Sequence, residues 1–556
     1  MKYILRFLIF TGMYLLLAAC GSSAPITPSP VSPLTSTETS TLTAIPTQES
    51  ASNSTLDDPL PTVDFSTPSA GAYPTLLPTI DPESARDLLR EAISIQTLTG
   101  IKGHTLQQIT GWDYGFQQFP GNGYTWLDSR HLLLHPRTGE EPKQFMDGSR
   151  VEDSSSQPGI VNLEDGRFWY PWLSTPTPIY YSPELGIVFL QEIYGSATGP
   201  AKEAVFTYTL DGQEITRYWG KILGVSPSGT KILVDEDTVI DLKQNKIIDL
   251  AWHMDYDLYS PPKLYWSSDE ARLYRCCFYF ADLKTGESYS FNWSDMRGQD
   301  GKTASFSLQP HSDGRWVRND RYFFALWDYW SYAGDPTVMF SPTEMKYYII
   351  ETPADSAIRA DTTTYTISPD GQYVWILGYS EMDSAYHSFL VDLSNFNTTS
   401  YDIPNNRFVW SADSKFGWML DIDTNNSYIL SVDSKELLPF PVNPQYETAS
   451  WHPKESILAY MAENNQTLAL LNAVDMTVQG WKLPKSVASF LWSPDGDRMA
   501  FVLSDGSLWQ ADTPNFQNLE QITAPMPGLR DVSWSPDGSS IAFVSGTDIY
   551  VVKARK

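Results

Sequence analysis

Trp492-Ser493-Pro494-Asp495-Gly496 and Trp534-Ser535-Pro536-Asp537-Gly538 are two copies of one pentapeptide, 42 residues apart near the end of the chain. In each copy an aromatic residue ends a strand and a turn follows, in which proline suits the second position and glycine tolerates a positive φ. The apolar run Ile541-Ala542-Phe543-Val544 comes next and indicates a buried strand. Repetition at this spacing predicts an array of identical supersecondary units.

Weaker copies of the pentapeptide extend the array upstream, mostly at intervals of 41 to 44 residues. Their anchor residues are Trp451, Trp410, Ile367, Trp316, Trp266, Val225, Tyr181 and Trp126. A period of this length with four short strands is typical of a propeller blade. We therefore predict an all-β propeller of eight to ten four-stranded blades. Tyr181 and Trp316 are the least regular anchors, because longer intervals adjoin both of them.

Two further patterns support one closed ring. Asp-Leu pairs recur between the anchors and mark the turn from the third to the fourth strand; they are Asp241-Leu242, Asp282-Leu283 and Asp392-Leu393. The last unit has no outer strand of its own, whereas Leu106–Thr110 closely matches the outer strand Leu519–Thr523. We expect the early segment to complete the last blade, because closure removes exposed sheet edges.

The final repeat resembles the WD40-like (PD40) repeats of the TolB-type propeller family. The matching residues are Gln521-Ile522-Thr523, the second pentapeptide, Ile541-Ala542-Phe543 and Ile549-Tyr550. The resemblance covers the chain from about residue 105 and implies the fold rather than a function. The TolB family has an added N-terminal α/β domain and fewer blades, and neither feature matches, so its role is not transferred.

The first residues are typical of a targeting segment. Lys2 and Arg6 precede a short apolar core, and Leu17-Ala18-Ala19-Cys20 resembles the lipobox of a bacterial lipoprotein. The resemblance implies a signal peptide over 1–19, cleavage before Cys20 and lipidation of that cysteine. The alternative is a transmembrane anchor, for which the apolar core is short. We expect a lipid-anchored protein on the extracytoplasmic side, in the periplasm or at the cell surface.

The segment that follows, residues 20–80, is rich in Ser, Thr and Pro and has no Lys or Arg. It buries too little apolar surface to offset the entropy of ordering, so we expect a disordered tether, either O-glycosylated or a plain spacer. Residues 81–100 are predicted to hold a short helix, because Asp81-Pro82-Glu83 suits a helix N-terminus. The propeller is predicted over 101–556.

The formal net charge of −28 argues against a nucleic acid partner, since no basic stripe is available to neutralise phosphates. It also argues against electrostatic docking on anionic lipid. Membrane contact is therefore expected through the lipid on Cys20 alone. The acidic surface favours cationic partners or simply keeps the protein soluble.

No catalytic constellation emerges, so we expect neither an enzyme nor a cofactor. The Gly-x-Ser-x-Gly elbow of propeller-linked hydrolases is absent. Adjacent Cys276 and Cys277 would point to opposite faces of a strand, which is poor geometry for a disulfide. His131 and His135 would lie about 13 Å apart along a strand, too far to share a metal ion.

One segment has the alternating oxygen ligands of a calcium loop, with Asp421, Asp423 and Asn425 as the weak metal candidates. It lacks the central glycine, and its twelfth position is Val432 rather than glutamate. It also occupies the place of the recurring Asp-Leu turn. A tight turn is therefore the better interpretation.

Aromatic insertions are the strongest indication of a binding site. The candidate ligand-binding residues lie where the repeats lengthen; they are Trp169, Tyr170, Trp172, Trp327, Tyr329, Trp330 and Tyr332. Insertions in repeat arrays map to loops, often on the binding face, and Trp and Tyr are favoured recognition residues. Packing between blades is the alternative for each of them.

Three functions remain in competition. The favoured one is a binding or scaffold module for a protein, peptide or glycan in the cell envelope. The second is an extracytoplasmic hydrolase or lyase that acts on glycans, because a propeller assembles a site from several blades without a local motif. The third is a sensor or assembly component of the envelope. The fold by itself does not choose between them.

Overall fold

The structure is a computed structural model that describes residues 94–110, 123–134, 159–169, 179–196, 199–235, 237–250, 264–275, 279–291, 293–299, 301–303, 314–325, 337–350, 364–380, 384–403, 406–440, 449–462 and 465–554. All of them belong to the compact unit Pro74–Lys556. Within these ranges no helix has the length and apolar character needed to cross a membrane. The predicted signal peptide, the predicted tether and Cys20 lie outside them.

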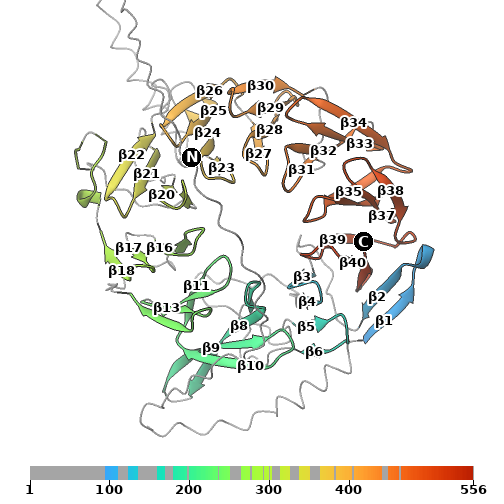
Figure 1. Cartoon of the computed structure of the whole chain (residues 1–556), viewed down its shortest axis with the longest axis horizontal. Helices are drawn as coiled ribbons and strands as arrows, with labels where there is room; N and C mark the ends of the chain where they lie inside the picture. Colours follow the sequence, from blue (N-terminus) through green and yellow to red (C-terminus); the bar gives the residue numbers. More distant parts are fainter. Residues whose placement is uncertain are drawn as a thin grey trace, which may run out of the picture. The chain divides into compact units, whose positions relative to one another are not determined.

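Ten antiparallel sheets follow one another around a ring (Figure 1). Blades 1 to 5 consist of β3 (Tyr124–Trp126), β4 (His131–Leu134), β5 (Gly159–Asn162), β6 (Phe168–Trp169); β7 (Ile179–Ser182), β8 (Ile187–Ser196), β9 (Gly199–Thr209), β10 (Glu214–Trp219); β11 (Ile222–Val225), β12 (Lys231–Val234), β13 (Thr238–Asp241), β14 (Lys246–Asp249); β15 (Leu264–Trp266), β16 (Arg272–Arg275), β17 (Tyr279–Asp282), β18 (Glu287–Ser290); and β19 (Arg315–Val317), β20 (Tyr322–Ala325), β21 (Thr337–Ser341), β22 (Lys346–Ile350).

Blades 6 to 10 consist of β23 (Thr364–Ile367), β24 (Tyr373–Ser380), β25 (Ala385–Asp392), β26 (Asn397–Tyr401); β27 (Asn406–Trp410), β28 (Phe416–Asp421), β29 (Ser427–Ser431), β30 (Glu436–Pro439); β31 (Ala449–Trp451), β32 (Ile457–Ala462), β33 (Thr467–Asn472), β34 (Thr477–Lys482); β35 (Val487–Trp492), β36 (Arg498–Leu503), β37 (Leu508–Asp512), β38 (Gln517–Gln521); and β39 (Arg530–Trp534), β40 (Ser540–Ser545), β41 (Asp548–Lys553), β2 (Thr105–Thr110), β1 (Ser94–Thr99). The two short 3-10 segments are η1 (Ile101–Gly103) and η2 (Trp293–Asp295).

The ring is closed as the sequence predicts. Strand β2 pairs with β41, with Leu106 opposite Val552 and Ile109 opposite Ile549. Figure 1 shows the first strands of the chain beside the last ones. Both Leu106 and Ile109 are buried, which confirms the prediction from their match to an outer strand. The blade count is ten, at the upper end of the predicted range.

The segment predicted as a short helix over 81–100 differs in its described part. Residues 94–99 form strand β1, which adds a fifth strand to the last blade by pairing with β2. Ser94, Gln96 and Thr99 face solvent there, so a backbone that pairs with the exposed edge of β2 prevails over local helix signals. The expected helix from Asp81 to about Ile93 lies outside the described residues.

Nine of the ten anchor residues pair, across the first turn of their blade, with the residue seven positions later, whereas Trp126 pairs with Leu132, six positions later. Trp534 faces Ile541, and the irregular anchors Tyr181 and Trp316 follow the same rule by facing Val188 and Phe323. The Asp-Leu pairs lie at the turn from the third to the fourth strand of their blades, as expected, because β13, β17 and β25 each end at the aspartate.

Tryptophan anchors also fasten neighbouring blades. Five indole Nε1 groups donate to the carbonyl of the residue just before the previous anchor; these pairs are Trp316–Tyr265, Trp410–Thr366, Trp451–Val409, Trp492–Ser450 and Trp534–Leu491, at 3.0 to 3.4 Å. In these five blades the repeated tryptophan therefore links its own blade to the preceding one.

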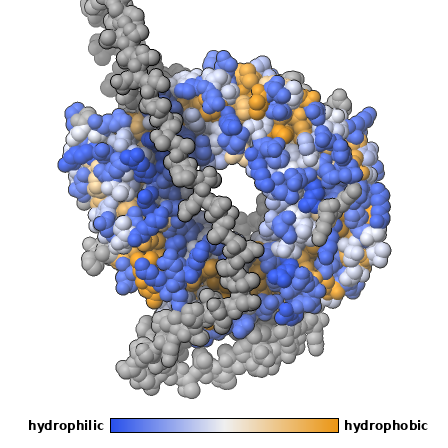
Figure 2. Space-filling view, viewed as in Figure 1, coloured by the Kyte–Doolittle hydropathy of each residue, from blue (hydrophilic) through white to orange (hydrophobic). Residues whose placement is uncertain are grey.

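The core is divided among the blade interfaces. Ten apolar clusters are buried, and each joins the facing sides of two adjacent sheets. Trp418 of blade 7, for example, packs with Trp451 and Tyr460 of blade 8. The face in Figure 2 is mostly hydrophilic, and an opening lies at the centre of the ring. Apolar burial thus holds the blades together and leaves this face of the ring mostly polar.

Candidate functional site: an arginine-lined cavity on the turn face

The first turns of successive blades contact one another, so they define one face of the ring, which we call the turn face. Ser182 Oγ in blade 2 donates to the carbonyl of Ser228 in blade 3 at 3.0 Å. Farther round the ring, Arg498 in blade 9 donates to the carbonyl of Gly538 in blade 10 at 2.7 Å. A substitution in one turn therefore alters the contacts of the turn beside it.

The pentapeptide turn is held by its serine and aspartate. Ser535 Oγ donates to Asp537 Oδ1 at 2.7 Å and accepts the Ser540 N–H at 2.9 Å. Asp537 Oδ1 also accepts the Ser539 N–H at 3.0 Å. Partial burial opposes ionisation of Asp537, but these hydrogen bonds outweigh it and lower the pKa of the carboxyl. Gly538, at φ +68°, completes the turn in the left-handed region that glycine adopts freely.

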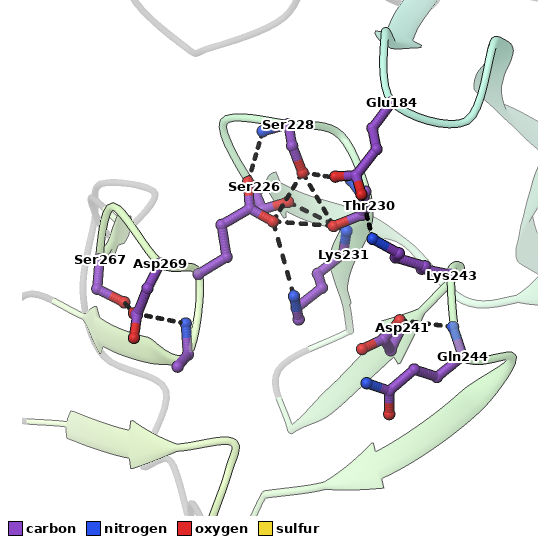
Figure 3. A network of polar contacts seen from close by, with 12 residues as sticks. Glu184, Ser226, Ser228, Thr230, Lys231, Asp241, Lys243, Gln244, Ser267 and Asp269 are labelled. Carbon is purple, nitrogen blue, oxygen red and sulfur yellow. Dashed lines mark hydrogen bonds and ion pairs between the residues drawn. The ribbon is translucent and has the colours of Figure 1, made fainter. Parts of the chain in front are cut away.

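Blade 4 replaces that glycine with Glu270, which keeps the left-handed conformation at φ +52° and is only 7% exposed. Its carboxylate accepts hydrogen bonds from the blade 3 turn: the Ser228 N–H at 2.5 Å, and Ser228 Oγ and Thr230 Oγ1 at 2.8 Å each. Lys231 Nζ lies 3.6 Å away. Figure 3 shows Ser226, Ser228, Thr230 and Lys231 of blade 3 in this network, together with Ser267 and Asp269 of blade 4. Burial raises the pKa of Glu270, but the hydrogen bonds from Ser228 and Thr230 prevail and lower it.

The same position reaches back to the preceding turn in two other blades. Asp320 of blade 5, at φ +59° and 5% exposed, accepts Ser268 Oγ at 2.6 Å and the Asp269 N–H at 3.0 Å. Ser414 of blade 7, at φ +63°, accepts the Asp370 N–H at 3.0 Å. A side chain at this position therefore links two turns, and the strained backbone is compensated by those contacts.

Blade 5 departs furthest from the repeat. Arg318, Asn319 and Asp320 occupy the last three positions of its pentapeptide, and all three have positive φ. The Arg318 N–H is bonded to the carbonyl of Gly371 in the next blade at 3.1 Å. A run of left-handed residues other than glycine is unusual. Here the run forms an arginine-rich turn in blade 5 that contacts the turns of blades 4 and 6.

A cavity of about 550 Å³ opens at this departure. Side chains from three blades line it: Arg272, Arg318, Asn319, Arg321, Ser341, Thr343, Glu344 and Gln372. All of these residues lie in or directly beside the turn between the first and second strands, or the turn between the third and fourth strands, of their blades. The volume is within the range of small-ligand sites.

The guanidinium groups are oriented before any ligand arrives. Arg318 and Arg321 both lie over the ring of Tyr322, at 5.1 and 5.3 Å from its centroid. Arg321 Nε donates to Glu344 Oε1 at 2.5 Å. Arg272 bonds the carbonyl of Asp320 through Nη1. Stacking and hydrogen bonds of this kind reduce the entropy lost when arginine binds an anion.

The lining of the cavity is positively charged, whereas the chain as a whole is negatively charged. Three arginines and one glutamate give its lining a formal charge of +2, whereas the chain carries −28. Arg272 Nε lies 3.7 Å from Asp282, and Arg321 is paired with Glu344. Arg318 has no ion-pair partner among the residues that the structure describes. It is therefore the guanidinium most available to an anion.

Of the aromatic candidates, Trp169 is the one that the structure describes. Trp169 is buried between blades 1 and 2, where its Nε1 donates to the carbonyl of Leu210 at 2.5 Å, so it occupies the packing role named as its alternative. The other candidates lie outside the described residues; they are Tyr170, Trp172, Trp327, Tyr329, Trp330 and Tyr332.

The metal candidates form the expected turn. Asp421 Oδ1 accepts the Asp423 N–H at 3.0 Å and Oδ2 accepts Thr424 Oγ1 at 2.5 Å, while Asn425 has φ +57°. Among the described residues no cluster of three or more His, Cys, Asp or Glu side chains is suited to a metal ion. His131 is buried and bonded to Asp128 through Nδ1 at 2.9 Å. His135, Cys276 and Cys277 lie outside the described part of the chain.

Sequence reasoning did not find the arginine cavity. A signal was present, because Arg318 and Arg321 fall inside one turn of a chain that has 38 basic residues against 66 acidic ones. The turn was interpreted as a degraded copy of the repeat. Arg321 and Arg272 can be assigned to the same cavity as Arg318 only when blades 4 and 5 are seen side by side.

No family model and no curated protein matches the chain. Solved structures match at low similarity. An oligogalacturonate lyase in complex with manganese is 12% identical over 52% of this chain and 88% of that one, with a TM-score of 0.29. A eukaryotic initiation factor is 12% identical over 73% and 98%, with a TM-score of 0.40. Hydrazine synthase of Kuenenia stuttgartiensis is 13% identical over 54% and 94%, with a TM-score of 0.25. Similarity at this level does not extend to a site or an activity.

Proposed function

We propose that this chain is a lipid-anchored, extracytoplasmic binding module whose arginine cavity holds an anionic group of a protein, peptide or glycan partner. The observation that carries the proposal is the charge reversal, a lining of +2 within a chain of −28. Such a site attracts the acidic part of a partner that the rest of the surface repels. It therefore sets the orientation of the partner as well as its affinity.

The anchored part of the proposal rests on the sequence. The lipobox-like Leu17-Ala18-Ala19-Cys20 and the tether over 20–80 would hold the propeller at a distance from the membrane. A fold of this kind is compatible with a scaffold, because its turns and loops present many positions on a rigid ring. An envelope sensor or assembly component would use the same face.

A catalytic role of this cavity has less support. Glu344 is the one carboxylate among its described lining residues, and it already contacts Arg321 and, at 4.0 Å, Lys346. General acid–base catalysis and glycoside hydrolysis need a second titratable group at a defined distance. The lining offers hydrogen-bond donors and positive charge, which are the chemistry of recognition.

Binding of the mature chain to polyglutamate, polyphosphate and a uronic acid polymer tests the proposal, with neutral dextran as the control ligand. We expect at least one polyanion to bind and the affinity to fall with added salt. The double variant Arg318→Gln, Arg321→Gln should bind about tenfold more weakly, since each lost charged hydrogen bond is worth more than about 1 kcal/mol.

Arg217→Gln is the matched control, because Arg217 also stacks on an aromatic ring, at 4.6 Å from Phe206, but lies in blade 2 away from the cavity. It should bind as the parent does. If no polyanion binds, or if the double variant binds equally well, the proposal is wrong.

Membrane attachment is tested separately by fractionating cells that express the parent chain or Cys20→Ser. The parent should incorporate labelled palmitate and sediment with membranes, and the variant should do neither. Sedimentation of the variant with the membrane without label would favour the transmembrane anchor instead.

A further inference from the structure

The chemistry of the cavity lining narrows the class of ligand, and this inference rests on the proposed function. All eight lining side chains are polar or charged. Small-molecule sites are usually lined by apolar and aromatic groups with a few polar ones. A ligand that matches this cavity therefore presents hydrogen-bonding groups on most of its surface in addition to its negative charge.

Neutral polar groups surround the arginines. Asn319 and Thr343 are exposed, Gln372 is half-buried, and Ser341 is buried at the end of β21. Hydroxyl and amide groups both donate and accept hydrogen bonds, so they suit a ligand that carries several hydroxyls. An acidic peptide presents fewer hydroxyl groups to these side chains than a sugar does.

Glu344 makes the cavity favour a carboxylate ligand over a phosphorylated one. Its carboxylate is 24% exposed and lies in the lining beside Arg321. It repels a phosphate dianion more than a single carboxylate, because the repulsion grows with ligand charge. It can also accept a hydrogen bond from a ligand hydroxyl. The arrangement favours one negative charge with hydroxyls around it.

We infer that the cavity binds a carboxylated oligosaccharide. Arg318 pairs with the sugar carboxylate, since planar guanidinium and carboxylate groups match in two parallel hydrogen bonds. Arg272 and Arg321 add positive charge on either side, while Asn319, Thr343 and Gln372 bond sugar hydroxyls. Sugar stacking contributes nothing at this lining, so the affinity is modest and depends on salt.

Calorimetric titration of the mature chain tests the inference with four probes: a short uronic acid oligomer, its neutral counterpart of equal length and linkage, a sugar phosphate, and an oligoglutamate peptide. We expect the uronic acid oligomer to bind, and the neutral oligomer to bind at least about tenfold more weakly. Arg318→Gln should weaken uronate binding about tenfold, and Glu344→Gln should narrow the preference for uronate over the sugar phosphate.

Arg217→Gln serves again as the control for an arginine outside the cavity, and thermal unfolding of each variant verifies that it is folded. Tight binding of oligoglutamate or the sugar phosphate, abolished by Arg318→Gln while the uronate does not bind, overturns this inference and leaves the proposed function intact. Failure of all anionic probes overturns both. Uronate binding that Arg318→Gln does not change places the ligand elsewhere and overturns the assignment of the cavity.

Discussion

The turns of blades 9 and 10 and those of blades 4 and 5 have equal length but different chemistry. In blades 9 and 10, Gly496 and Gly538 supply the left-handed position and the turn carries no further polar side chain there. In blades 4 and 5, Glu270 and Asp320 hold the same backbone conformation and use their carboxylates to fasten the preceding turn. Where the repeat has another residue in place of this glycine, the side chain at that position thus forms a contact with the preceding repeat.

The comparison also explains where the cavity lies. Once Asp320 fastens the blade 4 turn, Arg318 and Asn319 occupy the turn positions that proline and aspartate hold elsewhere. The turn is stabilised by a neighbouring blade instead of by its own serine and aspartate. Its side chains are thereby released for recognition, which is a common division of labour in repeat arrays.

The largest effect is expected at the buried carboxylate. Glu270→Ala should lower the free energy of unfolding by about 3 kcal/mol, because it leaves Lys231 and the blade 3 turn without their partner. Urea denaturation of the two chains measures the difference. Glu214→Ala removes an exposed ion pair with Arg217 and should cost less than about 1 kcal/mol. Equal costs would show that Glu270 is not a link between blades.

A second test adds a side chain to the glycine turns. A Cβ at Gly496 would lie 2.0 Å from His452 Nε2, whereas at Gly538 the nearest atom is Arg498 Nη2 at 3.3 Å. Both positions have positive φ, so each alanine costs about 1 kcal/mol of backbone strain. Gly496→Ala should cost about 1 kcal/mol more, because the buried ring of His452 must move. Similar unfolding midpoints for the two variants would contradict the geometry.

A third test concerns the indole links. Trp451→Phe removes the hydrogen bond to the Val409 carbonyl, which the structure places at 3.1 Å. The buried Nε1 of Trp266 makes no hydrogen bond within the described residues, and the equivalent acceptor would be Gly224, which adjoins a register shift in β11. Trp266→Phe is therefore the control for lost area. The two variants should differ by about 1 kcal/mol in unfolding free energy. Equal values would show that the hydrogen bond of Trp451 does not stabilise the protein.

The smallest effect is expected from the turn aspartates. Partial burial opposes ionisation of Asp269, but hydrogen bonds from Lys284 and Ser267 prevail and lower its pKa to about 2. A lowered folded-state pKa stabilises the protein above the unfolded value of about 3.9, and that contribution is lost as the pH falls toward 2. Because 40% of the side chain is exposed, we expect less than about 1 kcal/mol.

Asp269→Asn checks this by the difference between parent and variant unfolding free energies at pH 7 and pH 3. The difference should shrink at the lower pH. A difference that grows on acidification would contradict the assigned direction of the pKa.

The fold could be predicted almost completely from the sequence, because each blade repeats the same local signals. Trp534 and Ile541, or Asp282 and Leu283, specify their turns without reference to distant residues. Even closure by β2 was visible, since an outer strand has a recognisable pattern. Strand β1 (Ser94–Thr99) was not predicted, because the helix signals at Asp81-Pro82-Glu83 favoured a helix over residues that instead pair with the edge of β2.

The site could not be predicted in the same way. Glu270 and Arg318 appear as faults in a repeat until the neighbouring turn is in place, because their partners lie 40 residues or more away. For Trp169 the sequence could not distinguish a binding residue from a packing residue, because tryptophan suits both roles. In the structure its indole Nε1 donates to the carbonyl of Leu210. Composition of a loop reports its chemistry but not which blade it faces.

Closure of the ring by its two ends has a consequence for how the chain matures. Gln108 bonds Asp548, a partner 440 residues later, and β2 pairs with no strand except β1 until β41 has been made. Blades 1 to 9 can each form from neighbouring residues as the polypeptide emerges, whereas the tenth requires the first and last strands together. Completion of the ring is thus a late event of high contact order. Loss of the final strand alone would leave a ring that is not closed, with unpaired strand edges on either side of the gap.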